Sequence, residues 1–151
     1  MERVINILIY LYRNYPKSNE LSYSRVILLL YLIEWKYSIK YFEKLTDLEW
    51  IIKGNKPICK NLYNIFDASS NFTIRITEDY QNIIYFLNSE KIINFEKEKT
   101  KETIDFVIEH CKDLEFYDLN NIVSSTYAII NTKENQIIDF VKLAKLYKGR
   151  D

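Results

Sequence analysis

Few residues in this sequence have the types and spacing that metal binding or catalysis requires. His110 is the only histidine, and its neighbour Cys111 points about 100° away around a helix, which makes the two a poor pair of metal ligands. The other cysteine, Cys59, is far away in the chain. Zinc sites and catalytic triads in their usual forms need histidine beside cysteine or carboxylate partners. We therefore interpret His110 as a surface or structural residue and both cysteines as small buried residues, and we expect no metal site and no cofactor.

Carboxylates and glycines give no catalytic pattern either. Residues 96–99, EKEK, alternate in charge, which is typical of a solvated surface. Glu34 interrupts an apolar stretch, and we interpret it as a solvated charge where a helix leaves the core. A glycine-rich phosphate loop is excluded, because Gly54 and Gly149 are the only glycines. We predict that the chain is not an enzyme.

Aromatic and basic side chains could instead bind a ligand. Four aromatic residues could form a stacking pocket: Trp35, Tyr37, Tyr41 and Trp50. Aromatic residues at such spacings more often pack in a core, and we prefer that interpretation. Three lysines, Lys53, Lys56 and Lys60, surround Pro57 and could contact a phosphate at a helix N-terminus. Exposed lysines beside a turn are common, so this pattern alone does not identify a phosphate site.

The apolar run from Val26 to Ile33 decides the architecture that would position these residues. It has eight apolar residues between Arg25 and Glu34, whereas a membrane-spanning helix needs about 20. Eight consecutive apolar residues in a helix face every direction, so such a helix must be packed on several sides. With Ser22 as its N-cap, the run predicts a central helix over about residues 22–42.

The remaining patterns predict further helices and one hairpin. Helices are expected over residues 2–13, from Pro57 to Phe66, after a cap at Thr100, after Asp118 and along a final stripe formed by Ile137, Phe140, Val141 and Ala144. Residues 45–51 could form a short extended segment. Alternation in residues 72–77, followed by 82–87, predicts a β-hairpin. The predicted fold class is mostly α (α+β), a single compact helical domain over residues 1–151 with one small β-hairpin.

Composition narrows the class of protein. Of 151 residues, 21 are Lys or Arg and 21 are Asp or Glu, which gives a formal net charge of zero and argues against broad attraction to nucleic acid. Two widely spaced cysteines favour a reducing, cytoplasmic location. The first 16 residues are expected to form a helix rather than a signal peptide, and no membrane association is expected.

Two stretches resemble a known family. Residues 21–57, LSYSRVILLLYLIEWKYSIKYFEKLTDLEWIIKGNKP, are similar to the core of the Panacea domain of SocA-like antitoxins, which shows an LLYL-type run, an aromatic-rich helix end, a "plT…W" segment and a Gly-Pro turn. The residues that carry this likeness are Leu29, Leu30, Tyr31, Leu32, Trp35, Leu45, Thr46 and Trp50. Residues 124–147 resemble the C-terminal pattern of the family through Asp139, Val141, Lys142, Leu143 and Ala144. The chain departs from the family at Lys56-Pro57, where Gly-Pro is usual, and in the more apolar run before Leu29.

The resemblance implies an antitoxin that binds and neutralises a cognate protein toxin, by direct contact or by delivery to a cellular protease. Since loops on a rigid scaffold often carry binding residues, we expect the partner at Trp50, Lys53, Lys56 and Lys60. For Trp50 the competing interpretation is a core residue packed on the central helix. The other family-motif residues are expected to be mostly structural.

Two other functions remain open at this point. Helices beside a hairpin are compatible with a nucleic-acid-binding transcriptional regulator, although no basic recognition helix is recognisable. A phage-carried host-interaction protein of the same domain is the second alternative. The sequence does not distinguish between chromosomal and phage origin.

Overall fold

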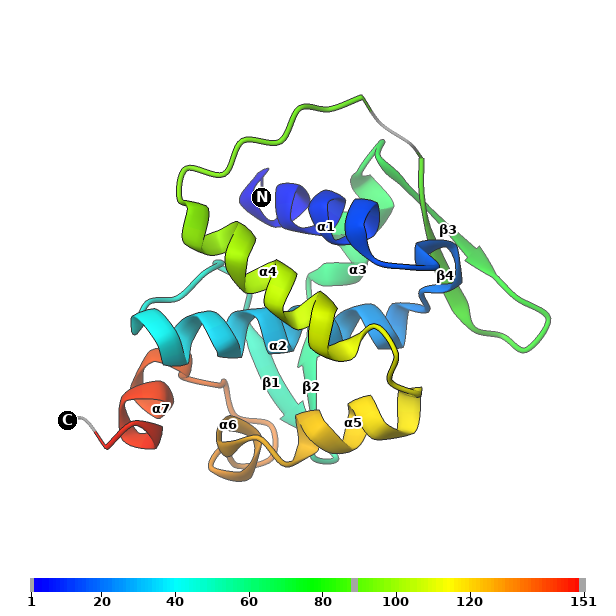
Figure 1. Cartoon of the computed structure of the whole chain (residues 1–151). Helices are drawn as coiled ribbons and strands as arrows, with labels where there is room; N and C mark the ends of the chain where they lie inside the picture. Colours follow the sequence, from blue (N-terminus) through cyan, green and yellow to red (C-terminus); the bar gives the residue numbers. More distant parts are fainter. Residues whose placement is uncertain (1, 88–89, 150–151) are drawn as a thin grey trace.

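A long central helix, α2 (Tyr23–Tyr41), organises the fold (Figure 1). The computed structural model describes residues 2–87 and 90–149. Helix α2 begins where the Ser22 hydroxyl accepts a hydrogen bond from the Arg25 N–H, and it ends at Phe42, whose φ is 55°. It packs against helices in several directions, which is the reason for its nearly continuous apolar sequence. The predicted central helix is confirmed to within one residue at each end.

The other helices surround α2. They are α1 (Glu2–Asn14), the short 3-10 helix η1 (Ser18–Glu20), α3 (Leu62–Ala68), α4 (Glu98–Cys111), α5 (Phe116–Ser124), α6 (Tyr127–Ile130) and α7 (Phe140–Tyr147). Helix α4 starts two residues before Thr100, so Thr100 is not its cap as predicted, and α5 starts two residues before Asp118 instead of after it. The mostly helical fold class is confirmed. Among residues 2–87 and 90–149, no helix is long and apolar enough to cross a membrane.

The described residues form two hairpins where one was predicted. Strands β3 (Phe72–Ile76) and β4 (Asn82–Phe86) confirm the predicted hairpin. A second hairpin pairs β1 (Trp50–Lys53) with β2 (Lys56–Cys59). The two residues between β1 and β2, Gly54 and Asn55, have φ values of 58° and 60°. Positive φ at both central positions is the mark of a type I′ turn, which suits the twist of antiparallel strands.

Pro57 therefore lies in a strand, and the prediction that it begins the third helix is wrong. It pairs with Ile52 of β1. The Ile52 carbonyl turns away from β2 and accepts a hydrogen bond from the Asn135 N–H at 2.8 Å. Opposite residues of such a pair both direct their backbone groups outward, so the missing N–H of proline removes no hydrogen bond of the β1–β2 ladder.

One core joins these elements. Among its least exposed side chains are Ile7, Leu8, Ile9 and Leu11 of α1, Leu29, Leu30, Tyr31 and Ile33 of α2, Trp50 and Phe66. At the C-terminal end, Ile138 and Phe140 are buried, whereas Ile137 is exposed and bridges to Ile51 of β1. The buried side of this segment thus differs by one residue from the predicted stripe at Ile137, because residues 135–138 run beside β1 before α7 begins.

Candidate functional site

Glu34 is buried in the core, which corrects its interpretation as a solvated charge. Glu34 is 1% exposed. One carboxylate oxygen accepts the Leu45 N–H at 2.7 Å. The other accepts the Thr46 hydroxyl at 2.6 Å and the Thr46 N–H at 3.2 Å. Three donors thus replace the water that a solvated carboxylate would bind.

The electrostatics of Glu34 reflect two opposed effects. Burial raises the pKa of its carboxyl above the ordinary value, and the hydrogen bonds from Thr46 and Leu45 oppose that rise; the net direction is upward. Thr46 in turn accepts the Leu48 N–H through its hydroxyl at 3.3 Å. The cluster therefore fixes the segment that connects α2 to β1. No local sequence signal predicts this contact, because Thr46 lies 12 residues after Glu34, in a different segment.

The residues that carry the family likeness lie mostly in the core. Tyr31 packs edge-on against Trp50, with ring centres 6.0 Å apart, and lies 5.8 Å from Phe140. Asp139 caps α7, because its carboxylate accepts the Lys142 N–H at 3.2 Å. The buried members of the set are Leu30, Tyr31, Trp35, Thr46, Trp50, Pro57, Leu143 and Ala144.

The aromatic residues that could have formed a stacking pocket pack in the core instead. Trp35, Tyr37 and Trp50 are buried, and Tyr41 is half-buried against Tyr37. Trp50, the first residue of β1, is 1% exposed and so offers almost no surface to a partner. Its expected role as a partner contact is corrected to the competing interpretation, a core residue packed on α2.

The three predicted lysines lie at two different places. Lys53 and Lys56 face each other across the Gly54-Asn55 turn, at the tip of the β1–β2 hairpin. Lys60 follows the other end of β2, because Pro57 continues an extended strand instead of starting a helix. All three are exposed. Glu134 also reaches the tip, where its carboxylate accepts the Gly54 N–H at 2.9 Å.

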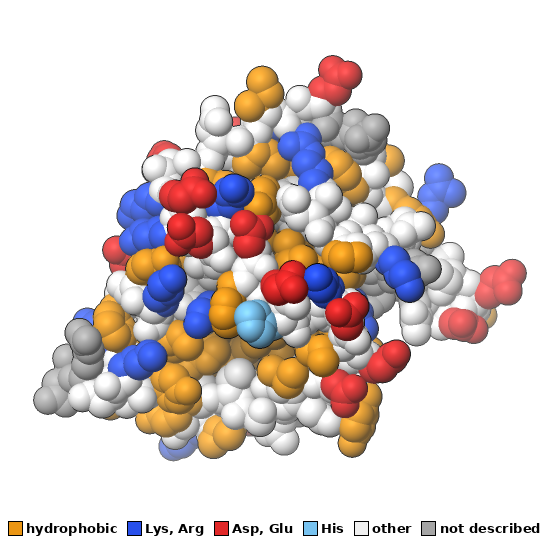
Figure 2. All heavy atoms as spheres, in the orientation of Figure 1, with side chains coloured by type: hydrophobic (Ala, Val, Ile, Leu, Met, Phe, Trp, Pro, Cys, Tyr) orange, Lys and Arg blue, Asp and Glu red, His pale blue; other side chains and the backbone are white. Residues whose placement is uncertain are grey.

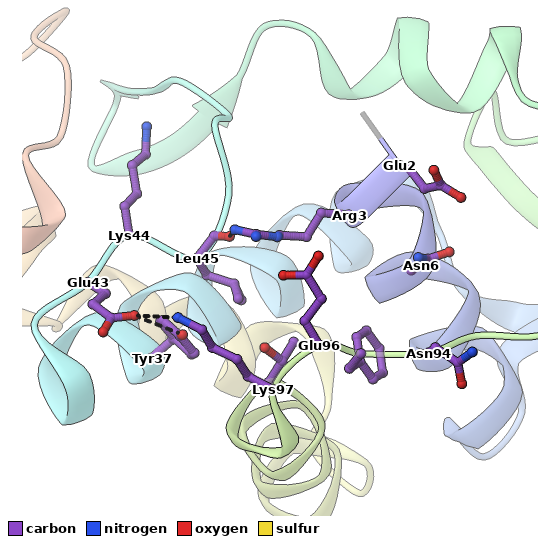
Figure 3. A pocket seen from close by; sticks show the side chains of 12 residues that line it. Glu2, Arg3, Asn6, Tyr37, Glu43, Lys44, Leu45, Asn94, Glu96 and Lys97 are labelled. Carbon is purple, nitrogen blue, oxygen red and sulfur yellow. Dashed lines mark hydrogen bonds and ion pairs between the residues drawn. The ribbon is translucent and has the colours of Figure 1, made fainter.

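A polar hollow of about 390 Å³ lies between α1, the end of α2 and the segment before α4 (Figure 3). Arg3 extends across it and donates to the Leu45 carbonyl at 3.2 Å. Glu43 accepts hydrogen bonds from Lys99 at 3.0 Å and from the Tyr37 hydroxyl at 3.2 Å. The bond from Lys99 holds the pKa of Glu43 below its ordinary value. Lys99 of α4 and Tyr37 of α2 thus share Glu43 as a hydrogen-bond acceptor, which links the two helices.

A second hollow, of about 610 Å³, is lined by Arg3, Val4 and the stretch from Thr46 to Leu48, with residues of α3 on its other side. Leu45 lines the first hollow and Thr46 the second. Glu34 binds both residues, so one buried carboxylate fixes a wall of each hollow. The sequence did not predict either hollow, because their walls come from segments far apart in the chain.

An apolar surface formed by α2, α4, α5, α6 and α7 is the strongest candidate for a contact with another protein. We call it the apolar face. It consists of the exposed residues Phe106, Ile122, Leu146 and Tyr147, the half-buried Tyr127, and Trp35, which is 6% exposed. A hollow of about 200 Å³ lies between Trp35, Phe106 and Ile122. Tyr147 continues the surface, with its ring centre 5.8 Å from that of Trp35. Figure 2 shows apolar side chains gathered over this part of the molecule, below α4.

Lysines border the apolar face. The Lys36 ammonium lies 4.1 Å from the centre of the Phe106 ring. Burial lowers the pKa of Lys36, and the charges of Lys40 and Lys148 lower it further. Three like charges are therefore near one another beside an apolar surface, an arrangement that an acidic partner would stabilise.

His110 lies on the surface, whereas both cysteines are buried. His110 is exposed on α4 and stacks on Phe106, with ring centres 4.0 Å apart. Cys59 and Cys111 are both buried, and burial raises the pKa of each thiol. In the part of the chain that the structure describes, no group of three or more His, Cys, Asp or Glu residues could hold a metal ion.

Comparison with known proteins relates the chain to one family. The family described as "Antitoxin SocA-like, Panacea domain" matches residues 28–143. This region runs from within α2 to within α7 and includes the Glu34 cluster, both hairpins and most of the apolar face. No curated protein and no solved structure matches the chain.

Proposed function

We propose that this chain, which belongs to the SocA-like antitoxin family of Panacea domains, neutralises a protein toxin by binding it. The family description supports an antitoxin-like role with a protein partner. The proposed action is binding rather than catalysis, and the toxin is expected to be encoded beside this chain.

The observation that carries the proposal is the apolar face with its border of lysines. Phe106, Ile122, Leu146 and Tyr147 are large apolar residues that are exposed although the chain has a well-packed core. Contiguous exposed apolar surface of this kind is typical of a protein–protein contact. Aromatic residues are common in the centres of interfaces, and charged residues are common at their rims. The complementary surface on the toxin would be apolar at its centre and acidic at its border.

The first experiment is co-expression with the product of the neighbouring gene. If that product arrests growth, the chain is expected to restore growth and to co-purify with it as a stable complex. Normal arrest despite co-expression, with no complex on purification, would contradict the proposal.

Surface variants then locate the contact. Ile122→Glu and Leu146→Glu place a charge on the apolar face and are expected to weaken toxin binding by about tenfold or more, because each buries an unpaired charge in the complex. Ile92→Glu is the matched control. Ile92 is also an exposed isoleucine, at 82%, but it lies in the segment before α4. All three variants should keep the melting temperature of the original chain.

The mode of neutralisation can be measured in the same cells. Direct inhibition predicts that the toxin accumulates to a normal level in an inactive complex. Delivery to a cellular protease predicts that the toxin level falls when the chain is present and recovers when the protease is absent. A pulse-chase measurement of toxin half-life separates the two.

A second candidate function, binding of nucleic acid, is favoured by one observation, the proximity of Lys36, Lys40 and Lys148. A salt series separates it from toxin binding. Affinity for the upstream DNA that falls steeply with salt would support this alternative, since released counterions make phosphate binding strongly salt-dependent. No measurable DNA binding at low salt would dismiss it.

A further inference from the structure

The backbone groups of β3 divide into two rows. The Thr77 N–H donates to the Gln81 carbonyl at 2.9 Å, just beyond the strands, so this opposite pair is hydrogen-bonded. Hydrogen-bonded and non-hydrogen-bonded pairs alternate along antiparallel strands. With the observed register, Ile74 and Ile76 of β3 belong to non-hydrogen-bonded pairs. Their N–H and C=O groups therefore point away from β4, toward the outer edge of β3.

Hydrogen bonds from other segments reach the outer edges of β4 and β1. On β4, the Ile84 N–H donates to the Leu21 carbonyl at 3.2 Å. On β1, the carbonyls of Trp50 and Ile52 accept hydrogen bonds from Ile138 and Asn135, each at 2.8 Å. On β2, Pro57 has no N–H to expose, and the strand packs on α2 and α5. Helix α3 packs against β3, but within residues 2–87 and 90–149 no hydrogen bond reaches the outward backbone groups of Ile74 and Ile76.

Ile76 and Arg75 of this edge are exposed, whereas Ile74 is half-buried against the core. Ile76 is 69% exposed, and Arg75 is also exposed. Ile74 and Ile76 lie on one face of the strand, and Arg75 lies on the other, over the ring of Tyr85 at 5.9 Å. The β3–β4 hairpin projects from one side of the molecule (Figure 1), so a new strand could approach.

We propose that the open edge of β3 binds an extended segment of a partner protein as an added antiparallel strand. The backbone of that segment would pair with the N–H and C=O groups of Ile74 and Ile76. Residues opposite Ile74 and Ile76 would be apolar, since they share a face with these side chains. The residue between them would be acidic, because it stands opposite Arg75. This surface lies on a different part of the molecule from the apolar face and does not depend on it.

A second copy of the chain fits this edge less well. If Ile74 of one copy paired with Ile76 of another, the two Arg75 side chains would stand opposite each other. Like charges in directly opposite positions destabilise a strand pair. If Ile76 paired with Ile76, or Ile74 with Ile74, Arg75 would stand opposite Thr77 or Thr73 and would gain no ion pair. An extended segment with an acidic residue at that position would instead form an ion pair with Arg75. Charge complementarity therefore favours a different protein segment as the occupant.

The probe is a capped synthetic peptide with the central sequence Thr-Val-Glu-Val-Thr, added to the full chain labelled with nitrogen-15. The amide resonances of Ile74 and Ile76 are expected to shift, and their hydrogen exchange to slow, with a dissociation constant in the millimolar range or below. A peptide with Lys in place of the central Glu should bind several-fold more weakly. The same peptide with methylated Val amides should not bind, because it lacks the N–H groups that pair with β3.

Ile76→Pro is the decisive variant. It removes the outward N–H of β3 and places a ring there, without removing a hydrogen bond to β4, and it is expected to weaken peptide binding by about tenfold or more. Ile76→Val keeps the N–H and should bind normally. The apolar-face variant Ile122→Glu should also bind the peptide normally, so a failure of toxin binding and a failure of this inference are distinguishable. Peptide-induced shifts outside β3, equal binding by Ile76→Pro, or dimerisation of the chain through this edge would each overturn the proposal.

Discussion

The side chains of Glu34 and Thr46 are joined by a 2.6 Å hydrogen bond, although 12 positions separate the two residues in the sequence. Glu34 belongs to the central helix, and Thr46 belongs to the segment that leads into β1. Their contact brings a carboxylate into the core and fixes the walls of two surface hollows. It also gives the protein a buried group whose protonation depends on folding.

We predict that Glu34 makes stability depend on pH. Because the pKa of Glu34 is raised in the folded protein, the folded state keeps a proton that the unfolded chain has already lost. This contribution is complete below the ordinary value of 4.5 and is lost as the pH rises through the folded pKa. As the pH rises from 4 to 8, the free energy of unfolding of the original chain should therefore fall relative to that of the Glu34→Gln variant. Urea denaturation of both proteins measures this difference.

Thr46→Val is the companion variant for this prediction. It removes a hydrogen bond that stabilises the ionised carboxylate, so the pKa of Glu34 should rise further and the loss of stability with pH should become steeper. The expected cost at neutral pH is about 1–3 kcal/mol. A difference between Glu34→Gln and the original chain that stays constant over this pH range would contradict the raised pKa.

We also predict that Gly54→Ala destabilises the β1–β2 hairpin through the backbone alone. A Cβ at Gly54 would contact nothing within 4 Å, but the φ of 58° is one that alanine adopts with difficulty. The expected loss in the free energy of unfolding is about 1 kcal/mol. Asn55→Gly keeps a residue suited to positive φ and serves as the control, with little change expected.

The central helix was predictable from sequence because eight consecutive apolar residues permit few environments. In a helix, the apolar side chains from Val26 to Ile33 face every direction, so the helix must be packed on all sides. This conclusion needs no information from the rest of the chain. The β3–β4 hairpin was predictable for a similar reason, since its alternation belongs to the strands themselves.

The environment of Glu34 could not be predicted, because the three donors that replace its water come from the backbone and side chain of another segment. Pro57 was assigned to a helix start, and the two-residue Gly54-Asn55 turn between WIIK and KPIC was the overlooked hairpin signal. That error also placed Lys60 beside Lys53 and Lys56. The apolar face could not be predicted from sequence, since its residues come from α2, α4, α5, α6 and α7 and only the arrangement of these helices leaves most of them exposed.

Substitution of a buried side chain of the central helix should have a large effect on stability. Leu30 is almost fully buried among the side chains of the core. Leu30→Ala is expected to lower the free energy of unfolding by about 2–5 kcal/mol. Leu30→Asp should prevent stable folding, because it buries an unpaired charge. Lys40→Ala, at an exposed position of the same helix, is the control, and thermal unfolding followed by circular dichroism measures all three.

The last prediction tests whether the tip of the β1–β2 hairpin contacts the toxin. Lys53 and Lys56 lie opposite each other there, beside the turn whose Gly54 N–H is bound by Glu134. If this tip contributes to the interface, Lys53→Glu combined with Lys56→Glu should weaken toxin binding by about tenfold. The melting temperature should change little, since exposed charges contribute little to stability.

Lys60→Glu is the matched control, because it makes the same charge reversal at the opposite end of β2. Isothermal titration at two salt concentrations would measure all variants, and an electrostatic contact at the tip predicts that the loss is larger at low salt. Equal weakening by Lys60→Glu would indicate general attraction between charged proteins instead of a contact at the tip. Normal binding by the double variant would exclude the tip from the interface and leave the apolar face as the proposed toxin-binding surface.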